Sequence, residues 1–232
     1  MVSQKIPNLS VDCVIFGYNG KELKVLLIEQ KKISEQLKTQ YALPGDLVEI
    51  DEDLDEAANR VLFELTNIKD IYLEQFQAFG NPVRVKEQKD SDWLRSIREF
   101  PEERVITVAY YSLVNIEDVA PKGSAFADHT EWINVKKVPP LAFDHDQILN
   151  HALQRFRSEL VTKNIGFELL PPKFTLSQLQ QLHELVLDKK LDKRNFRKSI
   201  KKIDHLEPLD EKQTGVDHKP AQLYRFNPKK ED

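Results

Sequence analysis

The sequence predicts an α+β protein in which a mixed sandwich of strands and helices precedes a smaller helical module with a two-stranded wing. Short aliphatic runs alternate with amphipathic segments in the first two thirds of the chain, a proline-containing segment interrupts this pattern, and two adjacent amphipathic segments follow. At 232 residues the chain exceeds the usual size of one domain. We therefore expect a first domain over 1–163, a linker over 164–172 and a second domain over 173–232.

The first domain is expected to open with a hairpin of two strands. Val11–Tyr18 and Leu23–Gln30 are β-branched and aliphatic runs, and Asn19-Gly20 between them is a strong hairpin signal. Acidic residues followed by helically spaced apolar ones predict a helix over Asp51–Asn67. Further strands are predicted over 76–79, 104–115 and 131–134, with a closing helix over 145–162. We expect the charged stretch 84–103 to be a surface excursion.

The second domain is expected to be a helix-turn-helix with a wing. Gly166 and Pro171-Pro172 place the boundary before it, because these residues stop helices and stiffen a connection. Thr175 and Gln178 have the spacing of a capping box, and Asp192 is a suitable cap for the next helix. The predicted elements are helices over 176–187 and 192–204 and strands over 206–209 and 223–226.

The net charge of −4 is unevenly distributed along the chain. Residues 1–166 carry 20 Lys and Arg against 27 Asp and Glu, whereas residues 167–232 carry 14 against 11. From Lys189 to Lys202 there are eight basic residues and one acidic residue, Asp192. A mildly basic module therefore follows an acidic one, which is the order expected if the second module binds DNA.

Other features exclude several protein classes. The apolar runs are far shorter than the roughly 18 residues that cross a membrane. The first residues, MVSQKIPNLS, lack the basic and apolar segments of a secretion signal, so a cytoplasmic location without membrane contact is expected. The lone Cys13 lies in an apolar run and cannot pair within the chain, and we expect it in the core.

The run GDLVEIDEDLDEAANRVLFELTNI, residues 45–68, resembles the Nudix box. That pattern is a glycine, five residues, a glutamate, seven residues and then R-E-hydrophobic-x-E-E-x-G-hydrophobic. The register is set by Asp46 at the glycine and by matches at Glu52, Arg60, Leu62, Glu64 and Ile68. The AFG run over 78–80 and RVITVAYYSLV over 104–114 also resemble this family. The resemblance implies an α/β/α sandwich of the Nudix fold for the first domain.

The hydrolytic centre of the box is degenerate. Nudix chemistry needs three glutamates on one helix face to hold Mg²⁺ against a diphosphate, and here the positions are Val61, Glu64 and Leu65, while Asn67 replaces the second box glycine. One carboxylate neither neutralises phosphate charge nor activates water well, so we expect no hydrolysis and no resident metal or other cofactor. The alternative interpretation is an amphipathic acidic helix of another fold, in which Arg60 and Glu64 simply pair.

The helix expected after Asp192 has two distinct faces. Phe196, Ile200 and Ile203 form an apolar stripe, and long polar side chains project roughly opposite. We predict base reading by Arg194 and Asn195, because Arg bridges guanine O6 and N7 and Asn bridges adenine N6 and N7. The residues predicted to hold phosphates are Arg197, Lys198 and Lys201 on the helix and Lys219 near the wing tip. The alternative interpretation is a solvated basic face.

Three tail segments resemble the winged helix of the Nudix-related transcriptional regulators: GFELLPPKFTLSQLQQL over 166–182, DKRNFRK over 192–198 and LYRF over 223–226. Within that family the tail is most similar to the Bacteroidetes regulators of sugar use, including those that respond to arabinose. The resemblance implies a ligand-responsive DNA-binding repressor whose effector is a pentose or ADP-ribose, with the pentose preferred. A homodimer on a double-stranded operator is expected, because helix-turn-helix proteins commonly bind paired half-sites.

The effector is expected in the former active-site cleft. The residues predicted to line it are Asp46, Glu49, Glu52, Arg60, Glu64 and Arg104. This acidic set suits sugar hydroxyls better than a diphosphate, although Trp93, Arg95 and Arg98 in the charged stretch offer positive charge and keep ADP-ribose open. Two other functions stay open: a Mg²⁺-dependent Nudix hydrolase of a nucleoside diphosphate derivative that uses Glu49 and Glu52, and an adaptor that binds proteins through its basic tail.

Overall fold

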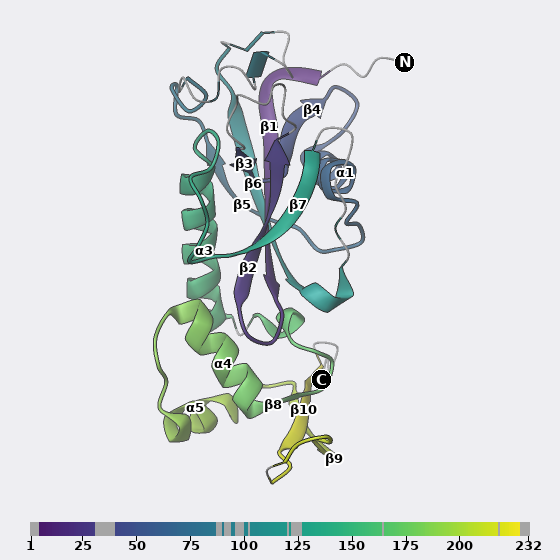
Figure 1. Ribbon diagram of the computed structural model, residues 1–232, viewed down its shortest axis with the longest axis vertical. Coiled ribbons are helices and arrows are strands. Elements are labelled where there is room, and N and C mark those ends of the chain that lie inside the picture. The colour runs from purple at the N-terminus through teal and green to yellow at the C-terminus, as the bar shows by residue number, and fades with distance from the viewer. Residues whose placement is uncertain are drawn as a thin grey trace.

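A computed structural model places a mixed sheet between helices and a winged module beneath it (Figure 1). The structure describes residues 5–30, 40–86, 90, 94–95, 100–101, 103–119, 121, 127–163, 165–217 and 219–227. Helices α1 and α3 lie on opposite sides of the sheet, and α4, α5 and β8 to β10 lie at the end where α3 finishes (Figure 1). In this part of the chain, no helix is long and apolar enough to cross a membrane.

The main sheet has seven strands within the described residues, with the order β3-β2-β1-β6-β5 and with β4 paired to β1 and β7 to β2. Its strands are β1 (Lys5–Tyr18), β2 (Leu23–Gln30), β3 (Tyr41–Ala42), β4 (Gly45–Glu49), β5 (Glu74–Phe79), β6 (Ile106–Asn115) and β7 (Ala127–Asn134). β1 runs parallel to β6 and antiparallel to β2 and β4. β3 and β4 were not predicted, because neither shows an alternating pattern long enough to indicate a strand.

The opening hairpin is confirmed, and its loop is longer than a two-residue turn. β1 and β2 pair up to Tyr18 and Leu23, which leaves four residues in the connection. Asn19 Oδ1 accepts hydrogen bonds from the backbone of Lys21 and Glu22 at 3.1 and 2.9 Å, and Gly20 has a φ of +82°. The asparagine side chain and the glycine thus close the turn.

Side chains of β1 alternate between two hydrophobic clusters. Val11, Cys13 and Ile15 face α1 (Leu54–Thr66), whereas Val14 and Phe16 face α3 (His145–Thr162). This alternation follows from the two-residue period of a strand buried on both faces. Cys13 is fully buried, as expected.

Helix α1 begins and ends at defined caps. The Asp53 carboxylate accepts from the backbone of Asp55 and Glu56, and the Glu56 side chain accepts from the backbone of Asp53 in return. Asn67 ends the helix in the left-handed conformation with a φ of +58°. Asparagine tolerates this conformation better than most residues, which explains how it stands where the Nudix box has glycine.

The prediction that 84–103 is a surface excursion is wrong for several described residues. Arg84, Val85, Asp90 and Leu94 are buried. The Arg84 guanidinium forms a short ion pair with Asp144, and the Asp90 carboxylate accepts from the backbone of Phe143 at 3.0 Å. High charge density predicted exposure, but paired charges are stable inside a protein.

The segment expected to be a linker is packed against the core. It contains the short helix η3 (Phe167–Leu169), and Phe167, Leu169 and Leu170 are buried in the same cluster as Phe156 of α3. The Phe167 ring stacks on Phe226 with centroids 4.0 Å apart. The connection is therefore a joint with its own apolar contacts rather than an exposed tether.

The winged module consists of β8 (Phe174–Thr175), α4 (Leu176–Leu187), α5 (Lys193–Ile200), β9 (Leu206–Lys212) and β10 (Gln222–Phe226). The bounds of α4 and its Thr175 capping box match the prediction. Helix α5 ends at Ile200 and not at Asp204. Its last turn tightens, because the amides of 202 and 203 bond to the carbonyls of 199 and 200. β8, which pairs with β10, is too short to be predicted.

Candidate nucleic-acid interface and effector site

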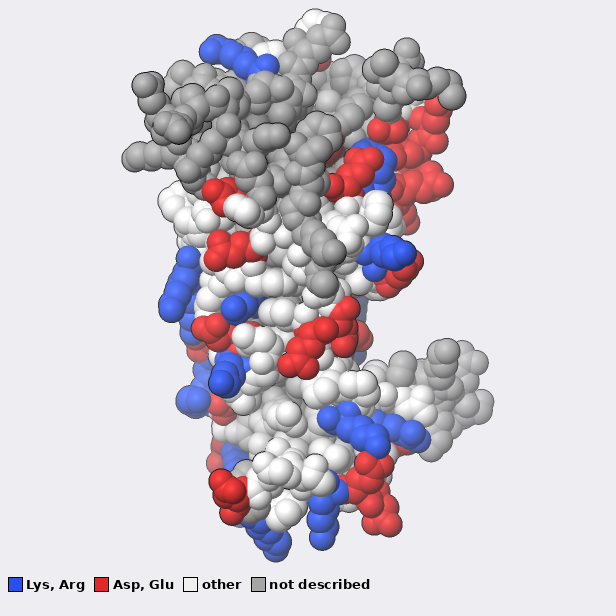
Figure 2. Space-filling view, turned by 45° about the vertical axis from the view of Figure 1, so that its right-hand side comes forward, with Lys and Arg blue, Asp and Glu red and all other residues white. Residues whose placement is uncertain are grey.

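Helix α5 separates its side chains into a buried stripe and an exposed basic face. Asp192 caps the helix by accepting from the backbone of Asn195 at 2.8 Å. Phe196 and Ile200 are buried against the rest of the module. The predicted DNA contacts Arg194, Asn195, Arg197, Lys198 and Lys201 are all exposed, as is Lys219 in the loop between β9 and β10. Basic side chains project from this lower end of the molecule in Figure 2.

The basic residues of the module fall into paired and unpaired groups. Lys190 pairs with Glu184, Lys173 with Glu211 and Arg225 with Glu207, at 2.7 to 3.0 Å. In contrast, the predicted DNA contacts form no ion pair with another described residue; these are Arg194, Arg197, Lys198, Lys201 and Lys219. Positive charge without an acidic partner among the described residues therefore lies on the exposed face of α5 and at the wing.

The angle between α4 and α5 is held by contacts that sequence patterns did not indicate. Glu184 Oε1 accepts from the backbone of Leu191 at 3.0 Å, and Gln180 Nε2 donates to the Leu191 carbonyl at 3.0 Å. The Leu191 amide and Lys190 lower the pKa of Glu184 to about 2. His183 contacts Phe196 edge to face at 5.2 Å, and burial lowers the His183 pKa to about 4. An ionised carboxylate and a neutral imidazole thus support the turn.

At the degenerate box, an arginine lies at the centre of the carboxylates. The Arg60 guanidinium donates to both oxygens of Glu52 at 2.8 and 2.6 Å and to Glu64 at 3.0 Å, and Glu49 is 3.8 Å away. Arg60 also donates to the Leu47 carbonyl at 3.0 Å. The hydrogen bonds that Arg60 donates to Glu52 and the attraction of the Glu52 charge raise the pKa of Arg60 further above its ordinary value. The structure thus brings four of the predicted effector residues together in one ionic cluster.

The two substituted metal positions lie in the interior. Val61 is 1% exposed and Leu65 is 8% exposed, and both pack in the hydrophobic cluster between α1 and the sheet. Glu64, the remaining carboxylate, has 49% of its side chain exposed. In the described part of the chain, no three acidic, histidine or cysteine side chains are grouped as ligands for a metal ion.

Asp46 lines a hollow that contains no residue of the Arg60 cluster. This hollow of about 40 Å³ is also lined by Asp12, Arg84 and His145. Gly45 fits this hollow because a Cβ there would lie 2.0 Å from Asp12 Oδ1. Asp46 therefore shares this hollow with residues that the sequence did not assign to the effector site.

The walls of that hollow contain a buried ionic network. Arg84 bonds to both oxygens of Asp144 at 2.6 to 3.1 Å and to Asp12 at 3.3 Å. His145 accepts from the Leu43 backbone at Nδ1, and its Nε2 faces Asp12 at 3.3 Å. Burial alone would raise the pKa of Asp12, but His145 and Arg84 hold it well below its usual range. Sequence reasoning missed the network because its members are far apart along the chain.

Of the remaining predicted residues, Arg104 makes its described side-chain contact outside both groups. Arg104 is exposed and donates to the Gly80 carbonyl at 2.8 Å, at the end of β5. Trp93 and Arg98 lie outside the described residues, so the structure does not place them. Arg95 is described and interacts with its surroundings.

Each of the two domains matches a known protein family. The NUDIX domain family matches residues 7–156, and the NrtR DNA-binding winged helix domain family matches residues 166–226. The ADPR responsive transcriptional repressor NtrR of Acinetobacter baylyi is 31% identical over 224 residues, which are 95% of this chain and 82% of that protein.

Solved structures show the same arrangement. Shewanella oneidensis NrtR in complex with a 27mer DNA has a TM-score of 0.70 and 28% identity, over 95% of this chain and 94% of that chain. The NUDIX domain of the same protein in complex with ADP ribose has a TM-score of 0.52 and 29% identity, over 66% of this chain and 90% of that chain. These relatives give no support to the narrower resemblance to arabinose-type regulators. The chain belongs to the NUDIX domain family and joins this domain to an NrtR-type DNA-binding winged helix.

Proposed function

We propose that this protein is a DNA-binding transcriptional repressor whose Nudix domain binds ADP-ribose and does not hydrolyse it. The observation that carries the DNA-binding part is the exposed face of α5, where basic side chains have no acidic partner among the described residues. Arg194 and Asn195 lie in the first turn of the helix, the part that contacts base edges in helix-turn-helix proteins. The relatives named as a repressor and as a DNA complex support this assignment.

In the proposed complex, α5 enters the major groove with its buried stripe toward α4. Arg194 and Asn195 read bases, while Arg197, Lys198 and Lys201 hold phosphates, and Lys219 holds the backbone beside the wing. We propose that the protein binds as a homodimer, with domains bounded at 1–163, 164–172 and 173–232. Light scattering on the full chain measures the subunit number directly.

ADP-ribose replaces a pentose as the proposed effector. The support is the name of the Acinetobacter relative and the ADP-ribose complex of the Shewanella NUDIX domain. The Arg60 cluster is acidic, with three carboxylates around one guanidinium, so this cluster offers hydroxyl partners rather than compensation for a diphosphate. We therefore expect the ribose parts of ADP-ribose, not its phosphates, to contact Glu49, Glu52 and Glu64.

The proposed loss of hydrolysis rests on the interior placement of Val61 and Leu65. Side chains buried in an apolar cluster neither ligate a hard cation nor leave room for its water ligands. Arg60 already engages Glu64, the remaining carboxylate of the three. A Mg²⁺-dependent assay over ADP-ribose and other nucleoside diphosphate derivatives tests this part. Turnover that disappears in Glu64→Gln would establish a hydrolase instead.

A binding experiment on the full chain tests the main proposal. Fluorescence anisotropy with duplexes selected from a random library should give sequence preference and a steep loss of affinity with added salt, because phosphate contacts release counterions. ADP-ribose should change the DNA affinity by about fivefold or more, within the usual range of coupling between sites, whereas arabinose and xylose should not. Binding with a shallow salt dependence and without sequence preference would support the protein-binding adaptor.

A further inference from the structure

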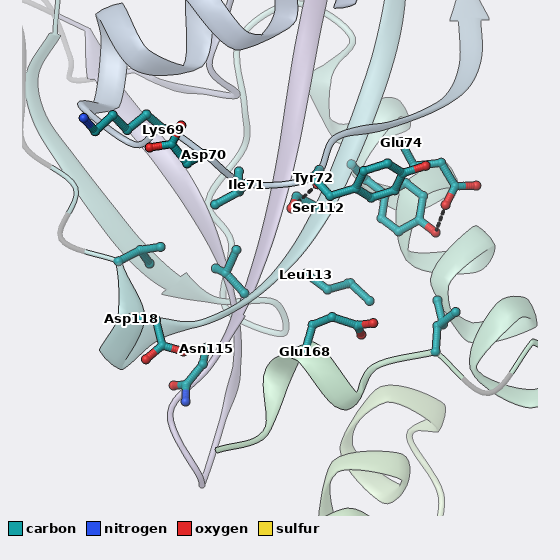
Figure 3. A pocket seen from close by; sticks show the side chains of 14 residues that line it. Lys69, Asp70, Ile71, Tyr72, Glu74, Ser112, Leu113, Asn115, Asp118 and Glu168 are labelled. Atoms are coloured by element: carbon teal, nitrogen blue, oxygen red, sulfur yellow. Dashed lines mark hydrogen bonds between the residues drawn. The ribbon is translucent and has the colours of Figure 1, made fainter. Parts of the chain in front are cut away.

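A cavity of about 550 Å³ lies between the Nudix domain and the segment that joins it to the winged module. Figure 3 shows its walls: the segment between α1 and β5, the end of β6, and η3. β5 pairs with β6 only as far as Tyr111, so the last residues of β6 form an open edge along one wall. The volume is within the usual range for small-molecule sites.

The cavity combines an apolar floor with hydrogen-bonding groups. Ile71, Leu113, Val114, Val119 and Ile165 supply aliphatic surface. Tyr72 is 79% exposed, which leaves its ring available to a ligand. Asn115 is 7% exposed and uses Oδ1 to accept from the Glu117 backbone at 3.1 Å, while its Nδ2 donates to no other described residue. An aromatic ring and an unused donor thus lie beside the same apolar surface.

The charged residues of the wall are mostly acidic. Glu74 is engaged by Tyr111 at 3.2 Å and by Arg155 at 3.4 Å. Glu168 accepts from the Gly166 backbone at 3.0 Å and faces the cavity in Figure 3. Asp70 and Asp118 are exposed carboxylates on the rim, and Lys69 is the basic residue among those that line it. The excess of negative charge disfavours a phosphate.

We propose that this joint cavity binds a nucleoside that carries no phosphate. Tyr72 and the aliphatic floor would hold a flat ring, since stacking on aromatic side chains accepts any base. The carboxylates of Asp118 and Glu168 accept hydrogen bonds from ribose hydroxyls, and the Asn115 amide donates one. The proposal goes beyond ADP-ribose sensing, because it assigns a second ligand class to a place outside the degenerate box.

The cavity is lined by residues that connect to the winged module. Ile165 and Glu168 flank Phe167, whose ring stacks on Phe226 of β10. On the opposite wall, Tyr111 donates to Glu159 of α3 at 2.5 Å, and α3 packs directly on α4. A ligand between these walls therefore contacts the Nudix domain and the segment that joins it to the winged module.

Isothermal titration of the full chain with three matched ligands tests the proposal. Adenosine is neutral, 1-methyladenosine carries a positive charge on the same ring and ribose, and AMP adds a phosphate. The expected order of affinity is 1-methyladenosine, then adenosine, then AMP, with AMP weaker than adenosine by about tenfold at low salt. ADP-ribose is titrated in parallel so that failure of the proposed effector is measured separately.

Two variants with matched controls place the site. Tyr72→Ala should weaken the binding of adenosine by about tenfold. Phe63→Ala, which removes an exposed ring from α1, should leave this affinity unchanged. Asp118→Asn should reduce the preference for 1-methyladenosine, because it removes one of the carboxylates of the cavity, and Glu117→Gln beside it should retain that preference. Absence of nucleoside binding at millimolar concentration, equal affinity for AMP, or unchanged affinities in both cavity variants would overturn the proposal.

Discussion

Replacing Arg84 by methionine tests whether the buried ionic network stabilises the Nudix domain. The guanidinium forms the link between Asp144 and Asp12, and all three side chains are buried. Methionine retains most of the aliphatic volume and removes the charge. Both carboxylates then lose their cation in a medium that solvates them poorly.

The expected loss of unfolding free energy is about 3–5 kcal/mol, because removing one partner leaves uncompensated charge in the interior. Arg104→Met is the matched control: that side chain is exposed, and its one hydrogen bond to another described residue is to the Gly80 carbonyl. Its expected cost is below about 1 kcal/mol. Urea unfolding followed by circular dichroism measures both variants. A cost for Arg84→Met no larger than that of the control would refute the stabilising role.

The difference in unfolding free energy between wild type and Arg84→Met should depend on pH. The folded state lowers the pKa of Asp12 below its ordinary 3.8, so ionised Asp12 contributes stability above that pH. This contribution is lost as the pH falls below about 4, because the unfolded state then binds the proton more readily. Removing Arg84 takes away part of the pKa shift. The stability difference between wild type and Arg84→Met should therefore narrow at acid pH, and a constant difference would exclude Asp12 as its source.

Three further predictions concern DNA reading and local structure. Arg194→Ala should relax the sequence preference at a particular base pair, whereas Lys201→Ala should lower the affinity for all DNA sequences alike. Equal effects of the two variants in a competition assay would contradict the assigned roles. Thr175→Ala should lower stability by about 1 kcal/mol in urea unfolding, because it removes the cap of α4, and no change would show that the cap is dispensable. Gly45→Ala should greatly reduce the yield of folded protein, since its Cβ would lie 2.0 Å from Asp12 Oδ1; a normal melting temperature would count against this close contact.

Local sequence signals predicted the bounds of α4, which begins with a capping box, and those of α3, which has no side-chain cap at its first residue. Thr175 and Gln178 mark the start of α4 at the observed residue, and α3 has its predicted bounds. Periodicity alone was less accurate at the end of α5, where the apolar spacing continues to Ile203 although the helix ends at Ile200. Ile203 still packs on the core from the following turn. A pattern of apolar residues therefore identifies a buried face better than it identifies the end of a helix.

The candidate site was predictable where its residues are close along the chain and not where they are distant. Glu52, Arg60 and Glu64 lie within one box and do form one cluster. Arg84 was assigned to a surface segment, because nothing local indicates that Asp144 compensates its charge. The joint cavity likewise arises from segments that only the fold brings together. Pairing between remote charged residues depends on topology, and one sequence does not reveal it.

The shared core limits how an effector can act on DNA binding. Phe156 of α3 and Phe167 of η3 pack in the same cluster as Leu179 and Val186 of α4, and Arg157 donates to the Val186 carbonyl at 2.7 Å. Separating the domains would expose several of these side chains at about 1.5–3 kcal/mol each. An effector shifts an equilibrium only by its difference in affinity for the two states, and typical coupling energies are about 1–3 kcal/mol. Such energies favour rotation of whole protomers in the proposed dimer over opening of the joint.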